Sequence, residues 1–177
     1  AMSAGAHMIN DVSGGKADPE MLEYVAKISA PYILMHWRGP SNIMNTLTNY
    51  DEVVRDVTME ISAQVEAAVS AGISRDRIAI DPGIGFAKTV EQNWPILKHL
   101  DVLDELGLPI LMGASRKKFL GELLARNGEP RVMEERESAT TAISTLMAFR
   151  NTWAVRVHDV KASRDAIAVV ERLAQTI

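Results

Sequence analysis

Cysteine is absent from the 177-residue sequence, which excludes disulfides and fits a reducing compartment. Long apolar runs are absent too, since none approaches the roughly 20 residues that a membrane-spanning helix needs. No charge of one sign predominates, because 19 basic and 23 acidic residues are interspersed and leave a net charge of −4. The sequence therefore has no electrostatic signature of a protein that binds nucleic acid or a membrane surface.

The first residues, 1–7, lack the charged and apolar regions of a signal peptide, so we expect a cytoplasmic protein. Residues 1–4 followed by Gly5 predict the last turn of a helix and its glycine C-cap. Because a chain seldom begins in the last turn of a helix, we expect a segment before it. The 47% hydrophobic composition is that of one globular domain with a buried core.

Five short apolar runs predict strands at 7–10, 32–36, 77–81, 109–113 and 154–158. Amphipathic segments predict helices at 19–28, 52–71, 94–106, 115–126, 135–149 and 162–175. Asp51 is the expected cap of the clearest helix, and Gly72 takes the position of its left-handed C-cap. Asn93 is the expected cap of helix 94–106. The two long loops, 39–50 and 127–134, carry no readable chemistry.

Alternation of strands and helices predicts a parallel sheet covered by helices. A (β/α)₈ barrel has eight strand–helix units in about 250 residues, so the five units of this chain are about three too few. Length alone favours a doubly wound open sheet. However, all five strands end in polar residues. Ligands gather at one switch point of an open sheet, whereas every strand of a barrel ends at the same mouth, so these endings favour an incomplete barrel.

Arg156 and His158 stand two apart on the last strand, so their side chains point to the same face. A guanidinium beside an imidazole can cradle a phosphate. The alternative is a salt bridge from Arg156 to a neighbour such as Asp159 or Asp165.

The segment GASRKK at 113–118 follows a strand and opens a helix, where backbone N–H groups favour an anion. Ser115 is the expected N-cap, and Gly113 allows a flat ligand to approach the backbone. The alternative is a capped surface helix with solvated basic residues, Lys117 among them.

Asp81 ends a strand before a turn with two glycines, and a partly buried carboxylate there needs a hydrogen-bond partner. A ring edge with two parallel N–H donors suits it, and the alternative is a structural aspartate that caps its own loop. Asn10 can donate to and accept from such an edge, or serve as a turn residue. Met35 and Phe86 are candidate flat contacts for a ring, or core residues.

Asp11 is expected to brace its loop, and His36 to be a satisfied histidine at the rim of the site rather than a ligand. The four histidines have no metal-ligand spacing, and no Ser/His/Asp arrangement is visible. We therefore expect no metal site within this sequence.

Taken in order, the strand-end motifs resemble those of dihydropteroate synthase along essentially the whole chain. The motifs are INDVSG at 9–14, LMH at 34–36, DPGIGF at 81–86, GASRK at 113–117 and VRVHDV at 155–160. Trp37 and the Asn93-Trp94 pair resemble the actinobacterial branch.

The resemblance implies a (β/α)₈ barrel of which this chain holds strands four to eight, the first three strand–helix units being absent. It implies condensation of 6-hydroxymethyl-7,8-dihydropterin pyrophosphate with p-aminobenzoate to 7,8-dihydropteroate and pyrophosphate in folate synthesis. It also implies Mg²⁺ bound through the pyrophosphate, with its protein ligand in the absent units, and a homodimer formed through the late helices. The chain alone is expected to be inactive or nearly so.

The resemblance also assigns roles to single residues. The pterin would be bound by Asn10, Met35, Asp81, Gly113 and Lys117; p-aminobenzoate by Phe86 and Ser115; and pyrophosphate by Arg156 and His158. Lys117, Arg156 and His158 would be the catalytic residues.

Two other functions remain open, a pterin-binding methyltransferase domain and a non-catalytic paralogue with a structural or binding role. A methyltransferase needs no pyrophosphate cradle, and a degenerate paralogue would be expected to lose Lys117 or Arg156.

Overall fold

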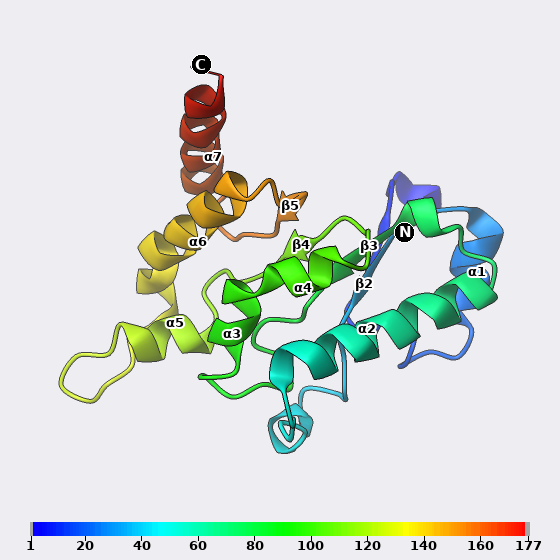
Figure 1. Cartoon of the computed structure of the whole chain (residues 1–177), viewed down its shortest axis with the longest axis horizontal. Coiled ribbons are helices and arrows are strands. Elements are labelled where there is room, and N and C mark those ends of the chain that lie inside the picture. Colours follow the sequence, from blue (N-terminus) through cyan, green and yellow to red (C-terminus); the bar gives the residue numbers. More distant parts are fainter. Residues whose placement is uncertain (1, 176–177) are drawn as a thin grey trace. The chain divides into compact units, whose positions relative to one another are not determined.

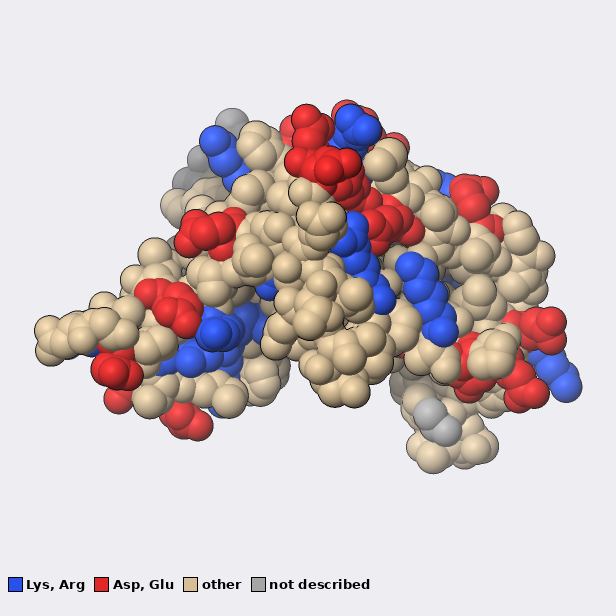
Figure 2. Space-filling model, turned by 90° about the horizontal axis from the view of Figure 1, so that it is seen from below, with Lys and Arg blue, Asp and Glu red and all other residues tan. Residues whose placement is uncertain are grey.

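The chain folds as an α/β protein in a computed structural model that describes residues 2–175 (Figure 1). It divides into two compact units, one up to Leu111 and one from Met112 onward. Of the residues described, no helix is both long and apolar enough to cross a bilayer. On the face shown in Figure 2, acidic and basic side chains lie beside one another, as their interspersion in the sequence predicts.

The first unit is built on three parallel strands in the order β1 (Ile9–Asp11), β2 (Tyr32–Met35) and β3 (Ile78–Asp81). Every residue of β2 and β3 is buried. Ile80 also makes a parallel bridge with Ile110, and its amide donates to the carbonyl of Pro109 at 2.8 Å. The predicted parallel sheet is therefore confirmed in this unit, with strands shorter than the apolar runs suggested.

Four α-helices accompany this sheet: α1 (Met21–Ile28), α2 (Val53–Ser70), α3 (Asn93–Lys98) and α4 (Leu100–Asp104). The predicted apolar face of α2, Val57, Ile61, Val65 and Ala68, is buried, and α2 packs against β2. Gly72 ends the segment at φ +100°, as the C-cap prediction required.

The expected cap of α2 was wrong. Glu52 precedes the helix, and Asp51 does not cap it with its side chain. Instead the carboxylate of Asp56, in the first turn, accepts the amides of Asp51 at 2.9 Å and Glu52 at 3.3 Å. A carboxylate inside the first turn thus satisfies amides just before the helix.

The single helix predicted at 94–106 was also wrong, because His99, with ψ +43°, leaves helical geometry and separates α3 from α4. Asn93 is the first residue of α3 rather than its cap. Its side chain accepts the Gly85 amide at 2.7 Å and donates to the Thr89 carbonyl at 2.6 Å. Asn93 therefore holds the loop after β3.

The second unit begins within the short strand β4 (Leu111–Met112), which pairs with β5 (Ala154–Val155). Helices α5 (Lys118–Leu123) and α6 (Glu137–Phe149) lie between β4 and β5 in the chain, and α7 (Val160–Ala174) follows β5. Helices α6 and α7 pack together, and the buried hydroxyls of Ser144 and Ser163 meet at 3.0 Å between them.

Three short 3₁₀ turns lie in the first unit and one in the second: η1 (Met2–Ala4), η2 (Met44–Thr46), η3 (Arg75–Arg77) and η4 (Met133–Arg136). The turn η1 and the positive φ of Gly5, +94°, agree with the helical turn predicted there, although residue 1 lies outside the described residues.

Asp11 braces the loop after β1, as predicted. Its carboxylate accepts the amides of Ser13 at 2.8 Å and Gly15 at 2.6 Å, and the Ser13 and Tyr32 hydroxyls. Burial raises the pKa of Asp11, but these four hydrogen bonds outweigh burial and hold the pKa below its usual range. The carboxylate is therefore a fixed anchor between the loop and β2.

We expect Tyr32→Phe to lower the free energy of unfolding by about 1–3 kcal/mol, because the buried hydroxyl donates to Asp11 at 2.7 Å and its loss leaves that carboxylate short of a donor. Urea unfolding measures this. The matched control is Tyr24→Phe on exposed α1, with an expected change within about 0.5 kcal/mol. Equal effects of the two substitutions would contradict the anchoring role.

Candidate functional site

The parallel strands of the first unit bring predicted site residues to one edge of the sheet. Met35 and Asp81 are register partners at the ends of β2 and β3, and Asn10 lies near the end of β1. Asp81 is 1% exposed, and its Oδ1 accepts the Gly83 amide at 2.8 Å, so it does cap its own loop. Asn10 is exposed, whereas Met35 is buried.

The loop after β3, residues 82–88, folds around the ammonium group of its own last residue. Lys88 is 8% exposed, and its Nζ donates to the carbonyls of Gly83 and Phe86, both at 3.1 Å. A third contact, at 3.0 Å, is with Nδ1 of His36. These contacts match the three hydrogens of an ammonium group.

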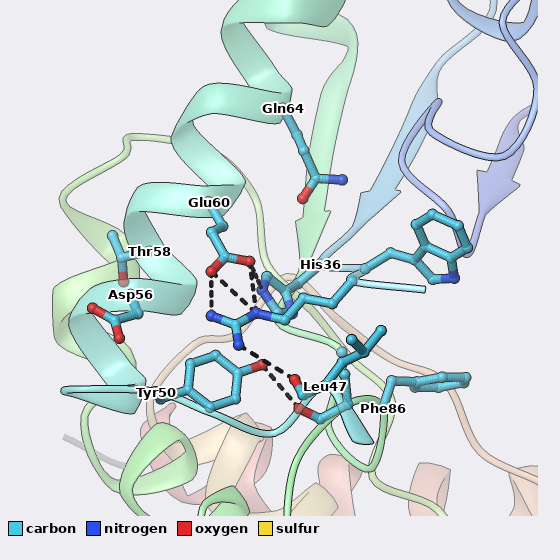
Figure 3. Close-up of polar contacts among 12 residues, drawn as sticks. His36, Leu47, Tyr50, Asp56, Thr58, Glu60, Gln64 and Phe86 are labelled. Atoms are coloured by element: carbon cyan, nitrogen blue, oxygen red, sulfur yellow. Dashed lines mark hydrogen bonds and ion pairs between the residues drawn. The ribbon is translucent and has the colours of Figure 1, made fainter. Parts of the chain in front are cut away.

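His36 lies between a cation and an anion and is fully buried. Its Nε2 is 2.9 Å from Oε2 of Glu60, on α2 (Figure 3). Its Nδ1 faces the ammonium group of Lys88 at 3.0 Å. Burial lowers the pKa of His36 to about 4, more than the Glu60 hydrogen bond raises it. The imidazole is therefore neutral near pH 7. It carries its hydrogen on Nε2, since Glu60 can only accept there and the ammonium can only donate to Nδ1.

Glu60 also binds Arg38, which extends the same network. Arg38 Nε donates to both Glu60 oxygens, at 3.1 and 3.0 Å, and Nη2 contacts Oε1 as well (Figure 3). Burial raises the pKa of Glu60, but the hydrogen bonds from His36 and Arg38 outweigh it and lower the pKa to about 2. Glu60 is therefore ionised at any ordinary pH.

Arg38 ties the long loop at 39–50 to this network. Its Nη1 donates to the carbonyls of Leu47, at 3.3 Å, and Asn49, and its guanidinium lies 3.6 Å from the ring centre of Tyr50. The Tyr50 hydroxyl donates in turn to the Ala87 carbonyl at 2.9 Å. The loop at 39–50 is thus joined to the loop at 82–88.

In the second unit, the ends of β4 and β5 lie close together. The hydroxyl of Ser115 lies 2.9 Å from Nδ1 of His158 and accepts the His158 amide at 3.2 Å. The Arg156 amide donates to the Met112 carbonyl at 2.9 Å. Predicted residues after both strands therefore meet in this unit.

The expectation that Ser115 caps the next helix was wrong. Helix α5 begins at Lys118, with Lys117 before it, because Arg116 adopts φ +57° and turns the chain out of helical geometry. Helix α6 and its N-cap residue, Arg136, fix this turn. Thr140 Oγ1 accepts the Arg116 amide at 3.1 Å, Glu137 accepts Arg116 Nε at 2.7 Å, and Arg136 donates to the Arg116 carbonyl at 3.0 Å.

Residues 1–158 match the family described as pterin binding enzyme. The chain belongs to this pterin-binding enzyme family. It is 49% identical over 172 residues to the dihydropteroate synthase of Mycobacterium leprae, an alignment that covers 96% of this chain and 61% of that protein.

Solved structures of family members agree with this. The Xanthomonas albilineans dihydropteroate synthase in complex with 7,8-dihydropteroate matches at a TM-score of 0.88 and 39% identity, over 99% of this chain and 62% of that one. The same enzyme with 4-aminobenzoic acid matches at a TM-score of 0.89, over 99% of this chain and 60% of that one. The chain thus spans about three fifths of the length of these relatives.

The nine residues to which the resemblance to dihydropteroate synthase assigned roles are divided between the two units. Asn10, Met35, Asp81 and Phe86 belong to the first unit; Gly113, Ser115, Lys117, Arg156 and His158 belong to the second. Within each unit the strand ends gather as predicted, and the binding roles stay predictions. His36 is satisfied, as expected, but it is fully buried rather than at the rim.

Sequence reasoning missed Lys88, Glu60 and Arg116 among the residues that shape these strand ends. One signal was available, since His36 and Arg38 have the same two-residue spacing at a strand end as Arg156 and His158. Two polar side chains on one face, such as His36 and Arg38, need a hydrogen-bond partner, and Glu60 is that partner.

Alanine substitutions at two glycines with nearly equal φ test how closely the loop at 82–88 approaches the residue after β2. Gly83→Ala, at φ +66°, would place a Cβ 2.6 Å from the His36 carbonyl, whereas Gly107→Ala, at φ +65°, meets nothing within 4 Å. Both substitutions carry the left-handed penalty of about 1–2 kcal/mol. We expect Gly83→Ala to lower the free energy of unfolding by about 1–3 kcal/mol more. Equal losses in urea unfolding would contradict the close approach.

The neutral state of His36 predicts a pH dependence of stability. Its pKa is about 4 in the folded chain and 6.5 ordinarily, so between these values the unfolded chain takes up a proton that the folded chain refuses. The free energy of unfolding should therefore fall, by up to about 3 kcal/mol, as the pH drops through this window. Glu60 adds a further loss only below about pH 4.5.

The control for this pH dependence is His36→Gln, which cannot titrate. The slope of unfolding free energy against pH reports the number of protons taken up on unfolding. Between pH 6.5 and 4, this number should be lower by about one than in the unsubstituted chain. An unchanged slope would show that His36 is not the group responsible.

Proposed function

We propose that the chain is the pterin- and pyrophosphate-binding part of a dihydropteroate synthase. The reaction joins 6-hydroxymethyl-7,8-dihydropterin pyrophosphate to p-aminobenzoate and yields 7,8-dihydropteroate and pyrophosphate. The observation that carries this proposal is the 49% identity to a dihydropteroate synthase along nearly the whole chain. The ordered strand-end motifs of the sequence support it.

The proposed architecture is a (β/α)₈ barrel of which the chain supplies strands four to eight. Parallel β1–β3, continued by the bridge from Ile80 to Ile110, support it. So does the match of 99% of the chain to about three fifths of the solved synthases. On this proposal three strand–helix units of the family precede these residues.

Asp81 and Asn10 are proposed to hydrogen-bond the edge of the pterin, and Met35 to contact its flat face. Burial of Asp81 beside a turn held at Gly83 supports a fixed acceptor there. Lys117 and Gly113, which follow β4, are also proposed to bind the pterin. Thr140 and Arg136 hold the backbone of Arg116 through hydrogen bonds. The backbone of the next residue, Lys117, therefore has a defined position.

Ser115 and Phe86 are proposed to receive p-aminobenzoate, and Arg156 and His158 to hold the pyrophosphate. The contact between Ser115 and His158 joins the residue assigned to the carboxylate with a residue assigned to the leaving group. A guanidinium matches the oxygens of a phosphate bidentately, which suits Arg156 to this role.

The chemistry requires positive charge more than a base. The C–O bond from the pterin methylene to the pyrophosphate breaks as the C–N bond to the amine forms, and the amine then loses a proton. Fixed positive charge on the departing pyrophosphate stabilises this transition state. A neutral aromatic amine needs no strong base to attack, in keeping with Lys117, Arg156 and His158 as the catalytic residues.

Mg²⁺ bound through the pyrophosphate stays part of the proposal, with its protein ligand outside these strands. Within the described part of the chain, no group of three or more His, Cys, Asp or Glu side chains is placed to hold a metal ion.

A homodimer through the late helices is also proposed. Helices α6 and α7 expose large apolar side chains that their mutual packing leaves uncovered, namely Leu146, Phe149, Val169 and Leu173. Such a set is suited to a second copy of the same chain.

The test joins the chain to the part of the Mycobacterium leprae synthase that the alignment leaves uncovered, placed before it. We expect this chimera to form 7,8-dihydropteroate and the chain alone to form nearly none. Lys117→Ala should lower kcat/KM at least about 100-fold, in line with the loss of one transition-state donor. Lys118→Ala is the matched control, because that neighbouring lysine is exposed and pairs with Glu122.

A folded chimera that binds neither the pterin substrate nor pyrophosphate, by titration calorimetry, would contradict the proposal. Equal titrations for Lys117→Ala and the unsubstituted chimera would favour a structural role for that lysine.

A further inference from the structure

Lys88 looks in the sequence like a phosphate-binding lysine, since it ends a glycine-containing loop after a strand. The structure gives it a different environment. It is 8% exposed, and its ammonium group contacts two carbonyls and one imidazole nitrogen at 3.0–3.1 Å. Its hydrogens point at the protein, so the group is poorly placed to meet an incoming anion.

The two carbonyls that Lys88 binds belong to the turn that it closes. Gly83, Gly85 and Ala87 all have positive φ, between +47° and +76°, which turns successive peptide groups in opposite directions. Their polar groups are held from several sides: Asp81 accepts the Gly83 amide, Asn93 the Gly85 amide, and Ala87 accepts the Tyr50 hydroxyl. Lys88 binds the carbonyls of Gly83 and Phe86 from within the turn.

His36 can accept from Lys88 only while its hydrogen stays on Nε2. Glu60 holds it there, because a carboxylate 2.9 Å from Nε2 can only accept. Arg38 keeps Glu60 in place through both carboxylate oxygens. The side chains thus form a series of directed contacts from Arg38 through Glu60 and His36 to Lys88, and on to the turn.

We propose that Lys88 is a positioning residue for the pterin site. It holds the turn at 82–87, and with it the Asp81 carboxylate and Phe86, while Glu60 acts on Lys88 through His36. This inference rests on the proposed function for the role of Asp81, but the ordering of the turn does not depend on that function.

The first experiment uses the chain as it stands and reads hydrogen exchange at the turn. Lys88→Met keeps a long side chain without the charge, and it should speed exchange of the Gly83 and Gly85 amides at least tenfold. The matched control is Lys98→Met, at the exposed end of α3, which should leave both rates within twofold. Unchanged Gly83 and Gly85 rates in Lys88→Met would overturn the proposal, whatever the chain's activity.

The second experiment measures ligand affinities in the chimera described above. Lys88→Met should weaken binding of 7,8-dihydropteroate at least tenfold and leave pyrophosphate affinity within twofold. The reverse pattern would make Lys88 an anion-binding residue and overturn the proposal. An unsubstituted chimera that binds no pterin would instead refute the proposed function and leave the exchange result standing.

Two variants of Glu60 separate positioning from simple stability. Glu60→Gln retains an oxygen that can accept from His36 Nε2, whereas Glu60→Ala does not. We expect Glu60→Gln to keep pterin affinity within about threefold and Glu60→Ala to lose it as Lys88→Met does. Equal pterin affinities for Glu60→Gln, Glu60→Ala and the unsubstituted chimera, in protein shown by circular dichroism to be folded, would rule out the path through His36.

Discussion

The contact of the Lys88 ammonium with the neutral imidazole of His36 is the interaction on which the first unit's strand ends depend. An ammonium group with so little exposure is unfavourable unless acceptors replace its water. Two carbonyls of its own turn and one ring nitrogen provide those acceptors. The turn thus surrounds the charge, and Asp81 is the strand-end residue from which that turn departs.

A direct pair of Lys88 with Glu60 would be the simpler arrangement, yet an imidazole separates the two charges. The neutral imidazole makes the hydrogen bonds directional, because one ring nitrogen donates and the other accepts. An ion pair constrains the distance between two groups more than their orientation. This series of hydrogen bonds constrains the orientation of each side chain as well. It also links α2 and the loops at 39–50 and 82–88 into one hydrogen-bonded network.

Periodicity in the sequence was sufficient to predict the parallel strands and the buried face of α2, because both follow from repeating side-chain burial. It failed where one polar side chain decides a local choice. Asp56 takes over the capping of α2, Asn93 serves the preceding loop instead of its own helix, and Arg116 turns left-handed because α6 holds its backbone. The partner of Arg116 is 24 residues away in the chain, and those of Asp56 and Asn93 are backbone amides of nearby loop residues. Apolar periodicity encodes neither kind of contact.

The candidate site divides in the same way. Motif order was enough to select the residues at the strand ends, but not the lysine, glutamate and arginines that fix them. The hydroxyl of Ser115 carries one such consequence. This hydroxyl accepts the His158 amide and has one hydrogen of its own. Nδ1 of His158 lies within reach of that hydrogen, 2.9 Å from the oxygen. A ligand carboxylate that accepted that hydrogen would remove it from the contact with Nδ1, so binding at Ser115 would change the hydrogen bonding of His158.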